Sequence, residues 1–203
     1  MKSPALLPCP RSLKLLRGIF TLPKRATIRL DHNDPGLLLI VKRLQAGVDE
    51  AGVELMSEGR VPRAPYFTPT IRASRNSALR NGDEEYALTI YPDGILIEYR
   101  EEPGLHAATA TLRQLLHQYG RRLPCLKIRD WPDLPRRGVM LDISRGRVPK
   151  LETLLDLAER LADFKINELQ LYTEHTFAYR KYKFIRQSWG ALTGAEIRKL
   201  DVR

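Results

Sequence analysis

The spacing of apolar residues predicts a strand, a helix and a second strand in the C-terminal third of the chain. Val139, Leu141 and Ile143 alternate inside a run that is apolar almost throughout, which is typical of a strand covered on both faces. The segment 151–165 predicts a helix, because its apolar residues recur at helical spacing and form one stripe. A second short strand is expected at 167–173. Two strands joined by one crossover helix form a βαβ unit, in which the strands run parallel.

A different pattern predicts a small α+β domain over residues 25–122, made of an antiparallel sheet with two helices. Apolar residues share one face over 86–91 and again over 95–99. The sequence Pro-Asp-Gly between these runs has turn chemistry, so a β-hairpin is expected there.

Helical spacing places one helix of this domain before the hairpin and one after it. Asp34 is expected to cap the first helix, with Pro35 at its first position and Gly52 beyond its end. The second helix is expected over 105–119, where Gly120 is placed to end it.

Charge raises the question of a nucleic-acid partner, because the 203 residues carry a formal net charge of +10. In the densest basic run, Arg180 to Arg186, basic residues are interleaved with aromatic residues. A protein that binds single-stranded nucleic acid would use such an arrangement. No known nucleic-acid motif surrounds the run. We therefore interpret it as a solvated loop, and the excess charge as the surface of a basic enzyme.

Targeting and redox features point to the cytoplasm. No apolar run is long enough to span a membrane, and charges and prolines interrupt the N-terminus where a signal peptide needs an unbroken apolar core. Cys9 and Cys125 lie far apart without metal-ligand spacing, so free thiols and no metal site are expected.

A pattern of fixed spacing runs through the βαβ region and the residues before it. Its positions are Asp130, Pro132, Arg137, Gly138, Leu141, Asp142, Ser144, Arg145, Lys165 and Asn167. The pattern resembles the start of the catalytic barrel in family 20 glycoside hydrolases, the β-N-acetylhexosaminidases. The hairpin and helix of the first half are similar to the supporting domain that such enzymes carry before the barrel, to which no catalysis is assigned.

The resemblance implies a division into four parts. They are an extended lead-in at 1–24, the α+β domain at 25–122, a linker at 123–136, and the first part of a (β/α)₈ TIM barrel at 137–203. It also implies removal of a terminal N-acetylhexosamine from a glycan with retention of configuration and without a cofactor. The acetamido oxygen of the substrate attacks its own anomeric carbon, which makes the family an exception to the two-carboxylate scheme. An Asp polarises the acetamide, and the neighbouring Glu serves as general acid and then general base.

The catalytic Asp-Glu pair, which the family places after its fourth barrel strand, is missing here. The neighbouring carboxylates of this chain, at 49–50, 83–85 and 101–102, all precede the barrel region and are expected in solvated turns or helix ends. A whole barrel needs about 250 residues, whereas 203 − 136 = 67 remain from Arg137 onward. We therefore expect an incomplete barrel in a truncated chain that is inactive alone and contains no catalytic residue. The alternatives are a non-catalytic carbohydrate-binding or scaffold remnant and, third, a basic nucleic-acid-binding protein.

Three residues are candidates for contacts with the sugar. Arg145 aligns with the family arginine that holds the O3 and O4 hydroxyls, a task that suits the fixed fork of a guanidinium. Its alternative role is an ion pair with Asp142 or a neighbouring strand, and Asp142 is expected to be structural because a carboxylate in a barrel strand needs a fixed partner. The family's usual His falls at Tyr172 and its first Asp at His175. Glu174 and His175, at the end of the second strand, are thus candidates for binding or acid/base support, or else an ordinary loop pair.

The predicted barrel fragment has a physical consequence. Strand edges and the apolar face of 151–165 are left exposed, which favours self-association. Thr193 to Glu196 reads as a capping box that opens a further helix.

Overall fold

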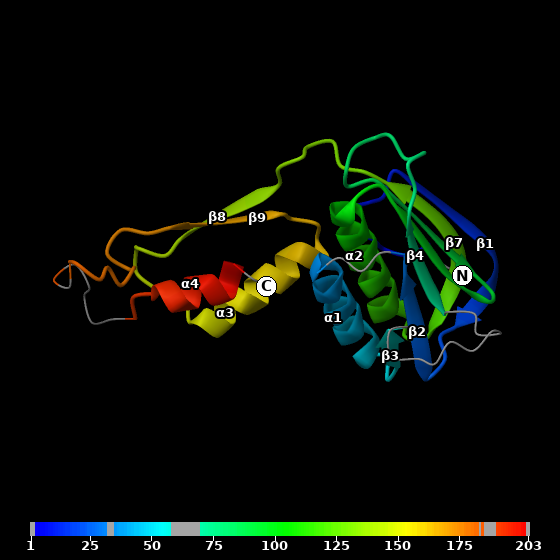
Figure 1. Ribbon diagram of the computed structural model, residues 1–203, viewed down its shortest axis with the longest axis horizontal. Coiled ribbons are helices and arrows are strands. Elements are labelled where there is room, and N and C mark those ends of the chain that lie inside the picture. Colours follow the sequence, from blue (N-terminus) through cyan, green and yellow to red (C-terminus); the bar gives the residue numbers. More distant parts are fainter. Residues whose placement is uncertain (1–2, 32–34, 58–69, 183, 185–189, 202–203) are drawn as a thin grey trace. The chain divides into compact units, whose positions relative to one another are not determined.

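The computed structural model describes residues 3–31, 35–57, 70–182, 184 and 190–201. The chain divides into two compact units, Met1–Asp133 and Leu134–Arg203. Each unit has its own apolar core, and Figure 1 labels their elements.

Seven strands form one mixed sheet in the first unit, in the order β1-β7-β5-β6-β4-β2-β3. Their bounds are Ser12–Thr21 (β1), Arg25–Leu30 (β2), Glu54–Ser57 (β3), Ile71–Arg75 (β4), Tyr86–Tyr91 (β5), Gly94–Tyr99 (β6) and Arg122–Asp130 (β7). β1, β7, β5 and β6 pair antiparallel, whereas β6, β4, β2 and β3 pair parallel. The prediction of an antiparallel sheet is therefore wrong for one half of it. The helix between β2 and β3 carries the chain back along the sheet, so β3 can run parallel to β2.

The predicted lead-in at 1–24 and linker at 123–136 both contain strands of this sheet. β1 pairs antiparallel with β7, and Leu13 faces Ile128 while Leu15 faces Leu126. The two segments thus pair with each other and join the sheet through β5. The predictions that they lie outside the domain are wrong, because apolar residues on each strand have partners on the other.

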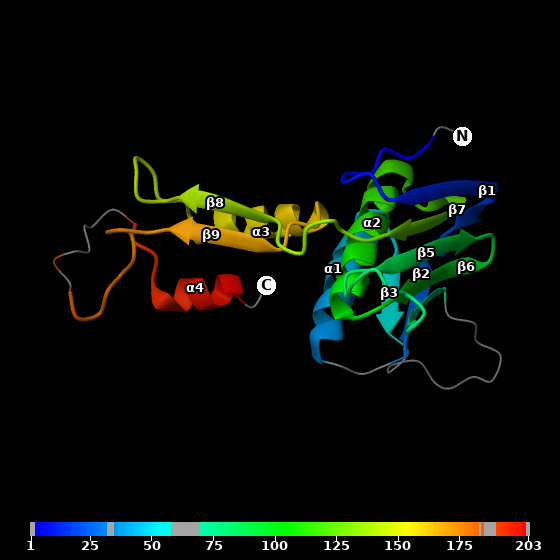
Figure 2. The ribbon, with the colours of Figure 1, turned by 90° about the horizontal axis from the view of Figure 1, so that it is seen from above.

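Two helices, α1 (Pro35–Asp49) and α2 (Glu102–Tyr119), cover one face of the sheet, as Figures 1 and 2 show. Both predicted helices are confirmed, although the predicted cap Asp34 lies outside the described residues. α2 begins before the predicted residue 105, close against β5. Gly104 permits this approach, since a Cβ there would lie 2.6 Å from the backbone oxygen of Glu85.

The covered face of the sheet is apolar across six strands. The cross-strand register joins Leu15, Leu126, Ile90, Ile95, Ile71 and Ile28 in one row. Five of them belong to the buried core together with residues of both helices. The opposite face of the sheet therefore presents the alternate residues of each strand.

The second unit begins with the predicted βαβ arrangement. β8 (Gly138–Asp142) and β9 (Glu168–Tyr172) run parallel, and α3 (Leu151–Asp163) connects them. α4 (Gly194–Asp201) follows, and the predicted capping box is confirmed, because the backbone N–H of Glu196 donates to Thr193 Oγ1 while the Glu196 carboxylate accepts from the backbone N–H of Thr193. The incomplete TIM barrel stays a prediction.

Several positions of the recognised pattern have structural roles at the start of β8. The Asn167 side chain accepts from the backbone N–H of Arg137 at 2.9 Å and donates to the Pro135 carbonyl at 2.8 Å. Arg137 Nε donates to the carbonyl of Lys165, a residue with φ of 60°. These bonds tie the end of the crossover to the start of the first strand.

None of the helices in the described part of the chain is both long enough and apolar enough to cross a membrane.

Candidate functional site

The candidate site lies where β8 and β9 end. Because these strands are parallel, their carboxyl ends meet at one edge, and Asp142 is directly paired with Tyr172. The residues that follow each strand, Ser144 and Arg145 on one side and Glu174 on the other, are thereby brought together.

Arg145 is held between two carboxylates. Its Nη1 donates to Asp142 Oδ2 at 2.9 Å, and its Nη2 donates to Glu174 Oε1 at 2.7 Å. The Tyr172 hydroxyl donates to the same Glu174 oxygen at 2.9 Å. The guanidinium carbon lies 5.6 Å from the centre of the Tyr172 ring, within range of a cation–π contact.

These neighbours raise the pKa of Arg145. The contact with Tyr172 and the hydrogen bond with Asp142 stabilise the charged form, and the negative charges of Glu174 and Asp142 add to the effect. The Arg145 side chain is nevertheless 65% exposed. It is therefore a fixed cation whose remaining N–H groups can reach a ligand.

Two roles are expected for Arg145, sugar binding and an ion pair, and Asp142 is expected to be structural. The ion pairs to Asp142 and to the neighbouring strand are present. Asp142 has the fixed partners that a strand carboxylate was expected to need, because its second oxygen accepts from the backbone N–H of Ser144 at 2.8 Å. The ion pairs orient the guanidinium without burying it, so the sugar-binding role of Arg145 stays a prediction.

Ser144 joins the two strand ends. Its hydroxyl accepts from the backbone N–H of Glu174 at 2.6 Å and lies 3.2 Å from the hydroxyl of Thr176. Ser144 is only 7% exposed and Thr176 only 4%. This buried contact fixes the position of Glu174 relative to Arg145.

His175 lies in a different environment from Arg145 and Glu174. It lines a pocket of about 160 Å³ together with Ser144, Arg147 and Thr176. The structure therefore brings two of the three candidates together, and places the third at an adjoining pocket.

Two contributors were not predicted as site residues. Ser144 entered only as one position of the fixed-spacing pattern, and Tyr172 only as the residue in the place of the family's usual His. Their positions in the sequence could have indicated that they belong to the site, because both lie at strand ends that a parallel βαβ unit must bring together.

Three further features bear on other chemistry. Within the described ranges, no group of three or more His, Cys, Asp or Glu side chains is arranged to hold a metal ion. Part of the basic run Arg180 to Arg186 lies outside those ranges.

The expectation of solvated carboxylates at 83–85 is wrong for Glu85, which is fully buried in the first unit and paired with Arg129 at 2.7 Å.

Comparison with known proteins identifies relatives of both units. The family model "Glycosyl hydrolase family 20, domain 2" matches residues 3–131. A beta-N-acetylhexosaminidase from Cellulomonas fimi is 28% identical over 181 residues, which cover 85% of this chain and 35% of the relative. An N,N'-diacetylchitobiase from Vibrio harveyi is 33% identical over 88 residues, which cover 43% of this chain and 10% of the relative.

Solved structures show the same fold. The GH20 exo beta-N-acetylglucosaminidase from Vibrio harveyi in complex with N-acetylglucosamine matches with a TM-score of 0.79 at 21% identity, over 97% of this chain and 34% of that one. The beta-N-acetylhexosaminidase from Bacteroides fragilis matches with a TM-score of 0.76 at 22% identity, over 96% of this chain and 40% of that one. The chain thus spans about a third of the length of the Cellulomonas fimi relative.

Proposed function

This chain belongs to glycosyl hydrolase family 20, and we propose that it contributes the supporting domain and the first two barrel strands to a β-N-acetylhexosaminidase. The reaction is removal of a terminal N-acetylhexosamine from a glycan by substrate-assisted, retaining hydrolysis. The names of the Cellulomonas fimi and Vibrio harveyi relatives support this reaction class.

The observation that carries the proposal is the fixed but exposed guanidinium of Arg145. Asp142 and Glu174 hold it at the carboxyl ends of two parallel strands, where barrel enzymes assemble their active sites. An oriented guanidinium can donate to two adjacent sugar hydroxyls at once. Arg145 is therefore assigned to the ring hydroxyls of the terminal sugar.

Glu174 positions Arg145 in this proposal. One of its oxygens already accepts from both Arg145 and Tyr172, and its backbone is fixed by Ser144. A carboxylate held in this way stabilises the orientation of the cation. His175, in the adjoining pocket, stays a candidate for binding.

The catalytic Asp-Glu pair is not assigned to any residue of this chain. The second unit contains no adjacent Asp and Glu in its sequence, so we infer that these 203 residues do not hydrolyse substrate by themselves. A cytoplasmic location stays a prediction from the sequence.

A double-mutant cycle between enzyme and substrate tests the role of Arg145. The chain is completed with the remaining barrel of the Cellulomonas fimi relative, and kcat/KM is measured on a chromogenic N-acetyl-β-glucosaminide and on its 4-deoxy analogue. Arg145→Lys is expected to lower kcat/KM on the full substrate by roughly 100-fold, since a hydrogen bond to a charged group contributes about 1.5–3 kcal/mol. On the 4-deoxy analogue, the loss should be much smaller.

The matched control is Arg160→Lys, the same change at an exposed position of α3. It should leave both rates unchanged. An equal loss on the two substrates would show that Arg145 does not contact the hydroxyl.

A further inference from the structure

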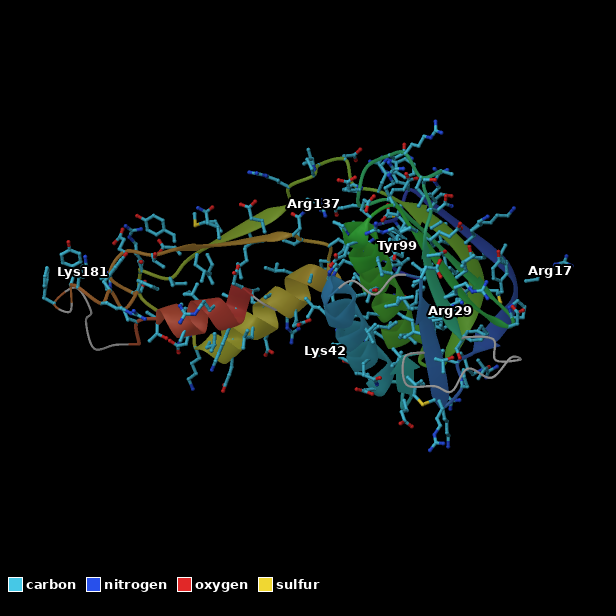
Figure 3. All side chains as sticks on the ribbon, in the orientation of Figure 1. Arg17, Arg29, Lys42, Tyr99, Arg137 and Lys181 are labelled. Carbon is cyan, nitrogen blue, oxygen red and sulfur yellow. The ribbon has the colours of Figure 1, made fainter. Side chains whose placement is uncertain are left out.

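A pocket of about 160 Å³ lies beyond the carboxyl ends of β8 and β9, and it is called here the strand-end pocket. Its lining includes Ile143, Ser144, Arg147, Val148, His175 and Thr176. Figure 3 labels Arg137, which directly precedes β8, so the pocket lies at the other end of this strand. Ser144 lines the pocket and also accepts the hydrogen bond that fixes Glu174 beside Arg145. The strand-end pocket therefore adjoins the proposed sugar contact.

Two buried hydroxyl groups belong to this lining. The hydroxyl oxygens of Ser144 and Thr176 lie 3.2 Å apart, so one of their two protons is used in the contact between them. A further acceptor is the carbonyl of Tyr172, 3.5 Å from Ser144 Oγ, which is long for a hydrogen bond from a hydroxyl. A ligand oxygen in the pocket can therefore accept the second proton.

The exposed part of the lining is basic. Arg147 and His175 are both exposed, and among the described residues that line the pocket there is no Asp or Glu. Arg145 is already paired with two carboxylates, whereas within the described ranges neither Arg147 nor His175 forms an ion pair. A guanidinium is always charged, and an imidazole always has at least one N–H to donate. The lining as a whole therefore suits an anion with several oxygens.

The volume limits what the strand-end pocket can hold. A cavity of about 150 Å³ accommodates a ring of about six carbon atoms. A sulfate ester together with the methylene carbon that carries it is of about the same size, whereas a whole N-acetylhexosamine is more than twice as large. The pocket therefore fits a substituent of a sugar and not the sugar ring.

We propose that the strand-end pocket binds a sulfate ester on carbon 6 of the terminal N-acetylhexosamine. The position on the sugar rests on the proposed function. In that reaction carbon 1 carries the leaving group, carbon 2 carries the acetamide that attacks, and Arg145 is assigned to adjacent ring hydroxyls. The group on carbon 6 is the substituent that remains, and rotation about its methylene lets it enter an adjoining pocket.

The donors of the pocket favour a sulfate over other anions. Its three terminal oxygens point in three directions, which allows separate hydrogen bonds from Arg147, from His175 and from the buried hydroxyls. A carboxylate has only two oxygens, which lie in one plane. A phosphate ester carries nearly two negative charges, whereas a sulfate ester carries one, which matches the single guanidinium of Arg147.

The test measures the Kd of the full chain for N-acetylglucosamine 6-sulfate, N-acetylglucosamine and inorganic sulfate, by NMR titration at constant ionic strength. The sulfated sugar should bind at least about tenfold more tightly than the uncharged sugar, because hydrogen bonds between charged groups contribute that much. Inorganic sulfate should bind more weakly than the sulfated sugar, since it lacks the contact with Arg145.

Arg147→Gln removes the charge of the pocket and keeps a side chain that donates hydrogen bonds. It should weaken binding of the sulfated sugar about tenfold and change that of the uncharged sugar less than about twofold. His175→Gln is a second variant with a change in the same direction. The matched control is Arg160→Gln, the same substitution at an exposed position of α3, which should leave every Kd within about twofold.

Four results would overturn the proposal: no binding of the sulfated sugar, equal binding of the sulfated and uncharged sugars, equal losses in Arg147→Gln and Arg160→Gln, or tighter binding of inorganic sulfate or of N-acetylglucosamine 6-phosphate. Arg145→Lys should instead weaken the sulfated and the uncharged sugar alike. The hydrolysis assays use unsulfated substrates and do not involve Arg147. Failure of this proposal is therefore distinguishable from failure of the proposed function.

Discussion

Glu85 is a buried carboxylate that the fold stabilises in its charged form. Its oxygens accept from the backbone and side chain of Asn81 and from the guanidinium of Arg129. Burial alone would raise the pKa of Glu85, but these hydrogen bonds and the charge of Arg129 outweigh it and lower the pKa below its ordinary value.

The lowered pKa of Glu85 predicts how stability depends on pH. The folded state holds the proton of Glu85 less tightly than the unfolded state does. The contribution of charged Glu85 to the free energy of unfolding is therefore present above the ordinary pKa of 4.5, and it is lost as pH falls through the pKa that Glu85 has in the folded state. Glu85→Gln should therefore lower the free energy of unfolding by about 1–3 kcal/mol at pH 7. In urea titrations, this difference should shrink steadily below pH 4.5.

The control for this prediction is Asp83→Asn, at an exposed position two residues away, which should change stability little. A Glu85→Gln defect of the same size at pH 3 as at pH 7 would contradict the assignment of a charged Glu85.

At the scale of elements, local periodicity was enough to predict the helices, the hairpin and the βαβ unit. It was not enough for β1 and β7, because each strand is recognised only by its partner more than 100 residues away in sequence, and prolines surround β1. The prediction of strand direction failed for a similar reason, because the parallel half of the sheet depends on where the chain returns after α1.

The site shows the same limit. The place of Arg145 at a strand end could be predicted from the sequence around it. Its contacts with Tyr172 and Glu174 depend on the register of two parallel strands, which pairs Asp142 with Tyr172. The sequence of each strand separately does not specify that register.

The exposed faces of β8 predict association of the chain. Within the described residues, β8 pairs only with β9, and Met140 is 58% exposed. Such strands pair readily with further copies. Met140→Lys should weaken self-association about tenfold, equivalent to about 1.4 kcal/mol, as measured by sedimentation velocity over a range of concentrations.

Thr153→Lys, at an exposed position of α3, is the matched control for Met140→Lys and should leave association unchanged. If the unaltered chain is monomeric at every concentration tested, the prediction fails.

On the scale of the whole molecule, two units with separate cores carry different parts of the proposed function. The first unit contains a seven-stranded sheet and two covering helices. The second contains a small core centred on Ile143, Leu154 and Leu192, and presents Arg145. The chain spans only about a third of the length of its Cellulomonas fimi relative.

Hydrolysis of a chromogenic N-acetylhexosaminide, by the 203-residue chain and by the chain completed with the remaining barrel of that relative, is the most direct test. We predict cleavage by the completed chain and none by the 203 residues alone. Cleavage by the 203 residues would contradict the assignment of the catalytic pair to the rest of the barrel, and would require a new assignment among the carboxylates of this chain, beginning with Glu174.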